Sequence, residues 1–205
     1  MKTRSAPTLC RYTKKFSPMD EDLISAVRTL KQGGLILYPT DTIWGIGCDA
    51  TCEKAVDRVY EIKKRRDEKS LLILLDDVEK LLYYVTEIPD IVWNLISITD
   101  RPLTIIYPGA RNMARNLIAD DGSIGIRIVK DPFCKAMIQK LGKPVVSTSA
   151  NVSGMPWPPY FQKIDKSIIS SVDYVVHHRQ QEKTRGRPSG IIKVTKGNVV
   201  KVIRE

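Results

Sequence analysis

Three hydroxyl groups and a carboxamide stand close together in the stretch Ser147-Thr148-Ser149-Ala150-Asn151. The turn Gly142-Lys143-Pro144 and the apolar pair Val145-Val146 come directly before it, which predicts a buried strand that delivers these polar groups to its C-terminal end. Polar groups at the end of a strand in an α/β sheet commonly bind a ligand. The alternative is an ordinary Ser/Thr/Asn turn whose side chains bond the local backbone.

A run of positive charge, Lys63-Lys64-Arg65-Arg66, joins a helix predicted over residues 51–64 to a strand predicted over 71–75. Such a turn can hold phosphate groups, because an arginine offers a planar fork of donors and a lysine offers a point charge. A solvated loop is the alternative, and the run alone does not separate the two.

Ser123 and Arg127 fall on one face of a strand predicted over residues 123–128, because isoleucines occupy the alternate positions. An arginine in the middle of a strand needs an anionic partner, since an unpaired buried charge is costly. We expect that partner to be either a carboxylate of the protein or a carboxylate of a ligand.

The elements that must position these residues alternate between helix and strand. Helices are predicted over residues 17–32, 51–64, 76–84, 89–98, 111–118, 131–141 and 162–171. Strands are predicted over 35–38, 71–75, 103–107, 123–128, 173–176, 190–194 and 199–203, with a further strand leading into the polar stretch. This order favours a single α/β domain, and several links too short for helical crossovers make its open sheet mixed, with helices on the faces.

Two loops carry signals of their own. Residues 39–47 read Pro-Thr-Asp-Thr-Ile-Trp-Gly-Ile-Gly. This pattern predicts a tight, hairpin-like return with polar groups at its tip and glycines that allow close packing. Residues 179–188 are polar, basic and interrupted by Gly and Pro, so we expect a mobile loop or lid there.

Composition limits the class of protein. With 205 residues, of which 42% are hydrophobic, the chain suits one soluble domain, which we expect over residues 16–205 after a flexible basic tail over 1–15. No apolar run approaches the roughly 20 residues that cross a bilayer, and the N-terminus lacks the apolar segment of a secretory signal. We therefore expect no membrane contact and a cytoplasmic location.

Cysteines and charge narrow the partners further. The four cysteines form no Cys-x-x-Cys pair and there are two histidines, so the sequence predicts no protein metal site and reduced, mostly buried thiols. The net charge of +10 indicates polyanionic partners, either the phosphates of a nucleotide or RNA. Charge alone does not distinguish these partners from a basic surface that keeps the protein in solution.

Taken together and in order, five motifs resemble the YrdC-type domain of the L-threonylcarbamoyladenylate synthase family. They are Pro39-Thr40-Asp41-Thr42-Ile43-Trp44-Gly45-Ile46-Gly47, Lys63-x-Arg65, Ser123-x-x-x-Arg127, Ser147-Thr148-Ser149-Ala150-Asn151-x-Ser153-Gly154 and Pro188-Ser189-x-Ile191. The resemblance runs from about Phe16 to the C-terminus, and the agreement of all the motifs makes it specific. It implies a twisted, open α/β sheet with a basic concave surface.

The resemblance also implies an activity. The family forms threonylcarbamoyl-AMP and pyrophosphate from L-threonine, bicarbonate and ATP, and Mg²⁺ carried with ATP is the implied cofactor. A downstream threonylcarbamoyl transferase then uses the product to modify tRNA at position 37. The implied mechanism has no protein nucleophile, because the carboxylate of N-carboxy-threonine attacks the α-phosphorus of ATP while the protein positions the reactants and neutralises charge.

The same resemblance implies site residues. The basic pair expected to be catalytic and to bind ATP is Lys63 and Arg65. The threonine-binding positions are Thr42, Arg127, Ser147 and Ser189. The further ATP-binding positions are Lys69, Ser123, Ser149, Asn151 and Arg204.

Some positions depart from the family pattern. Arg66 replaces a usual Pro, and Ser70 replaces a usual Pro or Gly. Gly190 replaces a common Thr, and Trp157 fills a position that is often small and polar. These differences bear on the pose of ATP. The alternative function is that of an RNA-binding relative, acting on tRNA or rRNA without synthase activity; the intact Ser-Ala-Asn part of the central motif favours the enzyme.

Overall fold

The computed structural model describes residues 17–64, 71–195, 197 and 199–205. Over that part of the chain the helices are α1 (Pro18–Lys31), α2 (Glu53–Lys63), α3 (Leu81–Tyr84), α4 (Asp90–Ile98), α5 (Pro132–Leu141) and α6 (Lys166–Ser170). The strands are β1 (Ile36–Tyr38), β2 (Gly45–Gly47), β3 (Leu72–Leu75), β4 (Leu103–Tyr107), β5 (Ile124–Ile128), β6 (Val145–Ser149), β7 (Tyr174–Val175), β8 (Gly190–Val194) and β9 (Val200–Arg204). The tail predicted over residues 1–15 lies outside the described residues.

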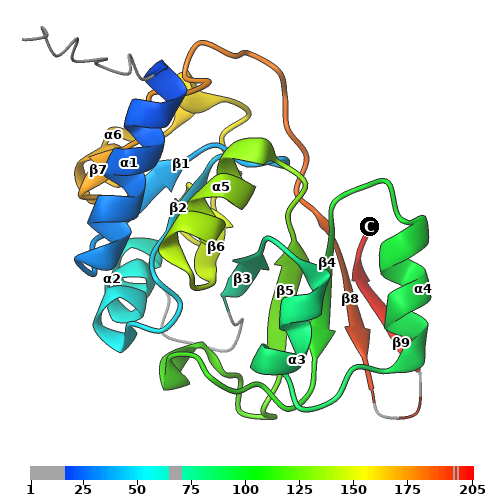
Figure 1. Ribbon diagram of the computed structural model, residues 1–205. Coiled ribbons are helices and arrows are strands. Elements are labelled where there is room, and N and C mark those ends of the chain that lie inside the picture. The colour runs from blue at the N-terminus through cyan, green and yellow to red at the C-terminus, as the bar shows by residue number, and fades with distance from the viewer. Residues whose placement is uncertain (1–16, 65–70, 196, 198) are drawn as a thin grey trace, which may run out of the picture.

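Among the described residues the strands form a nine-stranded sheet in the order β7-β1-β2-β6-β3-β5-β4-β8-β9 (Figure 1). Parallel pairs, such as β3 with β5, stand beside antiparallel pairs, such as β3 with β6. The predicted open, mixed α/β sheet is therefore confirmed. No helix of the described residues is long and apolar enough to cross a membrane.

The caps of α1 and α5 explain where these helices begin and end. The Ser17 hydroxyl accepts from the backbone N–H of Asp20 at 3.2 Å while the Asp20 carboxylate accepts from the Ser17 N–H, which forms a capping box. At α5 the Asp131 carboxylate accepts from the Cys134 N–H at 2.8 Å, and Gly142 ends the helix with a φ of 74°. Both starts agree with the sequence prediction.

Alternating side chains divide the core into one cluster on each face of the sheet. In β1, Ile36 and Tyr38 pack with α1 and α5, whereas Leu37 packs with the apolar face of α2. In β3, Leu74 belongs to the first cluster while its neighbours Ile73 and Leu75 belong to the second. Helices thus bury both faces of the sheet, which fixes the registers of its central strands.

The register of the central strands brings the chemical motifs together. β2 pairs with β6 so that Gly45 lies opposite Ser149. β3 pairs with β5 so that Leu74 lies opposite Arg127. The hairpin predicted over residues 39–47 is confirmed, with β1 and β2 antiparallel. At Gly47 an added Cβ would lie 2.7 Å from Tyr38 Cε1, so this glycine serves close packing of the chain.

Two predicted helices are wrong in extent. Residues 111–118 contain a single 3-10 turn, Arg115–Leu117, because Asn112 has a left-handed φ of 56° and its side chain donates to the carbonyl of Tyr83. The helix predicted over 162–171 is divided into a 3-10 turn, Phe161–Lys163, and α6. Asp165 divides them, since its extended backbone and side chain cap α6.

Residues 179–188, which we call the strap, lie against the β1–β2 loop. Arg179 Nη1 donates to the carbonyl of Thr40 and to Asp131, both at 3.2 Å, and its Nε donates to Glu182 at 2.7 Å. A Cβ added to Gly186 would lie 1.8 Å from the carbonyl oxygen of Thr42, so the two backbones are in direct contact. The segment that was predicted to be a mobile loop or lid therefore contacts the β1–β2 loop near both of its ends, through Arg179 and through Gly186.

Candidate functional site

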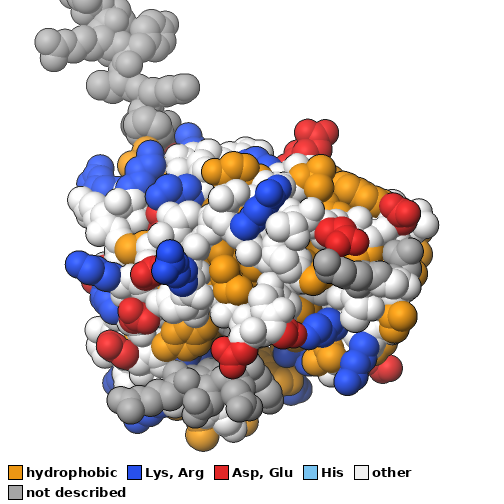
Figure 2. Space-filling model, turned by 90° about the horizontal axis from the view of Figure 1, so that it is seen from below, with side chains coloured by type: hydrophobic (Ala, Val, Ile, Leu, Met, Phe, Trp, Pro, Cys, Tyr) orange, Lys and Arg blue, Asp and Glu red, His pale blue; other side chains and the backbone are white. Residues whose placement is uncertain are grey.

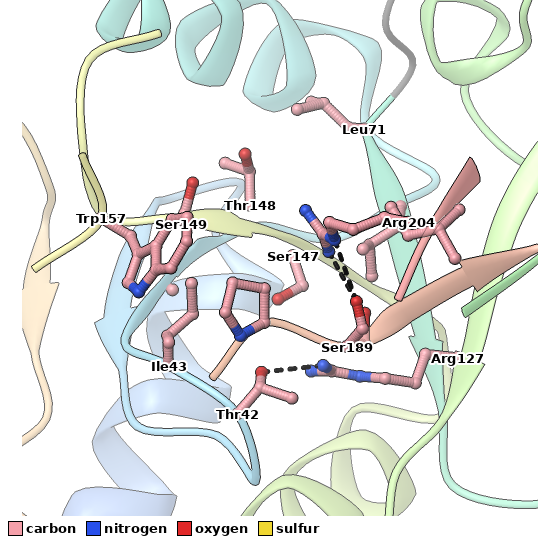
Figure 3. Close-up of a pocket in the computed structure, with 14 residues that line it drawn as sticks. Thr42, Ile43, Leu71, Arg127, Ser147, Thr148, Ser149, Trp157, Ser189 and Arg204 are labelled. Atoms are coloured by element: carbon pink, nitrogen blue, oxygen red, sulfur yellow. Dashed lines mark hydrogen bonds between the residues drawn. The ribbon is translucent and has the colours of Figure 1, made fainter. Parts of the chain in front are cut away.

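A cavity of about 270 Å³ opens where the β1–β2 loop, β3, β5, β6, β8 and β9 meet (Figure 3). This volume is near the lower end of the roughly 300–1,000 Å³ typical of small-molecule sites. The predicted site residues that line it are Thr42, Arg127, Ser147, Ser149, Ser189 and Arg204. The fold thus gathers residues from motifs that are far apart in the sequence into one concave site.

Arg127 supplies the buried positive charge of this cavity. Its side chain is 3% exposed, and Nη1 donates to the Thr42 hydroxyl at 2.8 Å. Nη2 lies 3.3 Å from Oδ1 of Asp41, whereas the Nε–H has no hydrogen-bond partner among the described residues. The expected anionic partner is therefore a carboxylate of the protein, and one buried donor of the guanidinium is left over.

Arg204 adds a second guanidinium to the same cavity. Its Nε and Nη2 donate to the carbonyl of Ser189 at 3.1 and 2.8 Å (Figure 3). Burial, and then the nearby charge of Arg127, lower the pKa of Arg204 below its ordinary value. The two guanidinium groups thus lie close enough to disfavour each other's charge, and an anion bound near both would relieve that repulsion.

Hydroxyl groups of the cavity are held by buried threonines behind them. Thr42 Oγ1 lies 2.8 Å from Thr40 Oγ1, and Ser189 Oγ lies 2.8 Å from Thr104 Oγ1. Thr40 and Thr104 are 4% and 1% exposed and do not line the cavity. The hydroxyl groups of Thr42 and Ser189 at the cavity are therefore each held by a hydrogen bond to a buried threonine behind them.

Lys63 is buried next to the cavity but does not line it. At 2% exposure, its ammonium donates to the carbonyls of Ser149 and Asn151 at 2.7 and 2.5 Å. The Ser149 hydroxyl and the Asn151 side-chain oxygen lie within 3.3 and 3.0 Å. The ammonium thus fixes the turn after β6, and Asn151 itself faces this lysine and lies outside the cavity lining.

The remaining predicted positions lie elsewhere. Ser123 is 6% exposed and donates to Asp121 at 2.5 Å, so it belongs to the turn before β5. Asp121 also pairs with Lys193, and these bonds, Lys193 first, lower the pKa of Asp121 to about 2. Arg65 and Lys69 lie outside the described residues, as do Arg66 and Ser70.

Two features of the site had no role assigned from the sequence. Asp41 neutralises Arg127, although this residue was given no role beyond its place in the Pro39–Gly47 motif. An apolar wall of Ile43, Trp157 and Pro188 closes one side, and Trp157 is still 43% exposed. The signal for Trp157 was its departure from a usually small, polar position, and in the structure its ring adds bulk to the cavity lining.

Charge outside the cavity is mixed. Figure 2 shows Lys and Arg side chains on the face seen from below, separated by Asp and Glu and by apolar side chains. At the cavity itself, Arg127 pairs with Asp41, and Arg204 donates to the carbonyl of Ser189.

Comparison with known proteins agrees with this geometry. The family described as "Telomere recombination", Sua5/YciO/YrdC, matches residues 28–205. A protein of Pseudoalteromonas translucida named threonylcarbamoyl-AMP synthase is 38% identical over 135 residues, which are 64% of this chain and 72% of that protein. The matched residues 28–205 include every described residue of the cavity.

Solved structures show the same fold. E. coli YciO has a TM-score of 0.79 at 24% identity, covering 91% of this chain and 89% of its own. P. abyssi Sua5, solved in complex with L-threonine, has a TM-score of 0.76 at 23% identity and covers 89% of this chain. This chain spans 53% of that longer protein. On the extent of the family match and the identity to the synthase, this chain belongs to the Sua5/YciO/YrdC family.

Proposed function

We propose that the protein is an L-threonylcarbamoyladenylate synthase, which converts L-threonine, bicarbonate and ATP to threonylcarbamoyl-AMP and pyrophosphate. The observation that supports this most is the Arg127 guanidinium, a buried cationic donor that lines the cavity beside small hydroxyl groups. A carboxylate suits that donor, and hydroxyls suit the polar groups of a small amino acid.

The proposed reaction has two steps, formation of a carbamate and its attack on ATP. The threonine amine and bicarbonate give a carbamate and water. A carbamate oxygen then attacks the α-phosphorus of ATP, the bond to the β-phosphate oxygen breaks, and pyrophosphate leaves with the electron pair. The protein contributes position and charge: Arg127 holds the amino acid, and Lys63, Arg65 and Arg204 are proposed to neutralise the phosphates.

The nucleotide is proposed to bind at the end of β6, beside Ser149 and the turn that Lys63 holds, with Lys69, Ser123 and Asn151 as further predicted contacts. Mg²⁺ is proposed to arrive as part of the substrate, MgATP, since phosphate oxygens are the ligands that Mg²⁺ prefers at such sites. Bicarbonate is the third substrate. A downstream transferase that uses the product to modify tRNA is the proposed partner, and tRNA itself is a proposed polyanionic ligand of this basic chain.

Pyrophosphate release by the purified protein tests the proposal. With MgATP, release is expected to require both threonine and bicarbonate, and to fall to background when serine replaces threonine or when ATP is omitted. Release without threonine contradicts the proposal. No release under any condition, together with salt-dependent binding of tRNA or rRNA, assigns the chain to the RNA-binding alternative.

A further inference from the structure

The β1–β2 loop contains a hydroxyl relay whose proton positions follow from the hydrogen-bond geometry alone. Thr40 Oγ1 lies 2.7 Å from the carbonyl oxygen of Ile43, and a carbonyl oxygen can only accept. The single hydroxyl proton of Thr40 is therefore committed to Ile43. At the 2.8 Å contact between the two threonine hydroxyls, Thr42 must be the donor.

The same reasoning leaves Thr42 with one remaining capacity. Its hydroxyl proton points to Thr40, and one of its two lone pairs accepts from Arg127 Nη1 at 2.8 Å. Thr42 lines the cavity and is 8% exposed. It can offer a ligand one lone pair and no proton.

Thr40 is saturated by comparison. It donates to Ile43, accepts from the Thr42 hydroxyl, and accepts from the Thr42 backbone N–H at 3.1 Å. At 4% exposure and outside the cavity lining, it does not reach a ligand. Its effect on a ligand must therefore pass through Thr42.

We infer that Thr40 is a positioning residue that sets Thr42 as a hydrogen-bond acceptor, so that this corner of the cavity selects a ligand group that donates. This inference rests on the proposed function, in which the ligand is an amino acid with two such donors, its ammonium and its side-chain hydroxyl. A ligand carboxylate is excluded from Thr42, because two acceptors in contact repel.

Ser189 provides an internal contrast. Its hydroxyl lies 2.8 Å from Thr104 Oγ1, and either atom can donate. Nothing in this pair fixes the direction of the proton, so Ser189 can serve a ligand as donor or as acceptor. The two supporting threonines thus have different consequences, although both are buried behind a cavity hydroxyl.

Binding calorimetry with matched ligands tests the inference. The ligands are L-threonine, L-2-aminobutyrate, which lacks the hydroxyl donor, and 3-hydroxybutyrate, which lacks the ammonium donor. One of the two analogues lacks the ligand group that donates to Thr42. The wild-type protein is expected to bind that analogue about tenfold more weakly than threonine. Thr40→Val releases the Thr42 proton toward the cavity, so this preference is expected to fall by about fivefold or more.

Two control variants separate positioning from packing. Thr40→Ser keeps the hydroxyl and is expected to keep the preference, whereas Thr104→Val removes a buried hydroxyl behind Ser189 and should also leave the preference at Thr42 unchanged. In pyrophosphate release, Thr40→Val is expected to raise the KM for threonine with little change in kcat. If Thr40→Val does not fold, Thr40→Cys, with its weaker donor and acceptor, is expected to shift the preference in the same direction.

The outcomes separate this inference from the proposed function. The inference is overturned if Thr40→Val leaves the preference unchanged or if Thr40→Ser loses it to the same extent. It is also overturned if the wild-type protein binds all three ligands equally. Wild-type protein that shows the preference but releases no pyrophosphate overturns the proposed function and leaves the inference standing.

Discussion

Arg127 and Lys63 are both buried cations at the same site, yet their hydrogen bonds differ in kind. Lys63 is 2% exposed, and its three ammonium protons face four oxygens of Ser149 and Asn151 at 2.5–3.3 Å. Arg127 is 3% exposed, and its Nε–H faces no acceptor among the described residues. The hydrogen bonds of Lys63 fix the chain, whereas Arg127 lines the cavity with one of its donors unpaired.

This difference indicates how a basic site divides its work. A buried cation whose donors are all used contributes mainly to stability, because its removal strands several acceptors. A buried cation with an unused donor lowers stability slightly and contributes to binding, because the ligand completes its set of partners. Substitutions of the two residues should therefore separate activity from stability.

Arg127→Ala should give the largest effect on activity. Threonine-dependent pyrophosphate release is expected to fall by about 100- to 1,000-fold, because the guanidinium donors and their charge are lost from the cavity. The fold should be retained, as judged by circular dichroism. Arg127→Lys is the matched variant: it keeps a charge for Asp41 but not the planar fork, so activity should remain low. Full activity in either variant would show that the Arg127 guanidinium does not hold the amino acid.

Lys63→Met should act on stability, in addition to removing the positive charge that is proposed to face the phosphates. The substitution keeps the aliphatic stem but removes the ammonium from the carbonyls of Ser149 and Asn151, so we expect the free energy of unfolding to fall by about 2–4 kcal/mol. Urea unfolding measures this, with the exposed neighbour Lys64→Met as control. Unchanged stability together with a complete loss of pyrophosphate release would establish the catalytic role that the sequence predicted for Lys63.

Asp22 extends the comparison to a buried anion, because its carboxylate oxygens accept hydrogen bonds from other groups of the protein. It is 3% exposed and accepts from the Tyr174 hydroxyl at 2.6 Å, from the His177 backbone at 3.0 Å and from the His178 backbone at 2.6 Å. Burial alone would raise its pKa, but these bonds outweigh burial, and the pKa is lowered from its ordinary value.

A lowered folded-state pKa sets the pH dependence. The stabilisation is fully present above the unfolded-state pKa of about 3.9 and is lost as pH falls through the lower folded-state pKa. Asp22→Asn should therefore lower the free energy of unfolding by about 1–3 kcal/mol at pH 7 and by less in strong acid. Urea titrations at both pH values measure the difference, with the exposed Asp90→Asn as control. A deficit that is equal at both pH values would contradict this account.

Local signals in the sequence were sufficient for much of the fold. Ser17 and Asp131 predicted the starts of α1 and α5, and alternation predicted β5, because caps and side-chain periodicity depend on near neighbours. The motifs also contained residues that meet at the cavity, such as Thr42, Arg127 and Ser189, although Lys63, Ser123 and Asn151 lie outside its lining. The spacing of Val59 and Lys63, one helical turn apart on the buried face of α2, was an available signal that the lysine faces inward.

The rest depends on contacts between distant parts of the chain. The pairing of Arg127 with Asp41 joins residues on different elements, and the Thr40–Thr42 relay depends on where one hydroxyl proton is committed. The division of 162–171 into two short helices depends on a cap at Asp165 that overrides the apolar spacing. Such features follow from tertiary geometry, which a single sequence specifies but does not display.

The strap has a consequence for how the protein is made. Arg179 bonds to Thr40 across 139 residues of sequence, and the cavity is completed by Ser189 and Arg204 from the last strands. A ribosome-bound chain therefore lacks a finished cavity until almost all of these residues have emerged. Small molecules that bind there can stabilise the completed protein but not its shorter nascent forms, so those forms depend on their own packing or on chaperones.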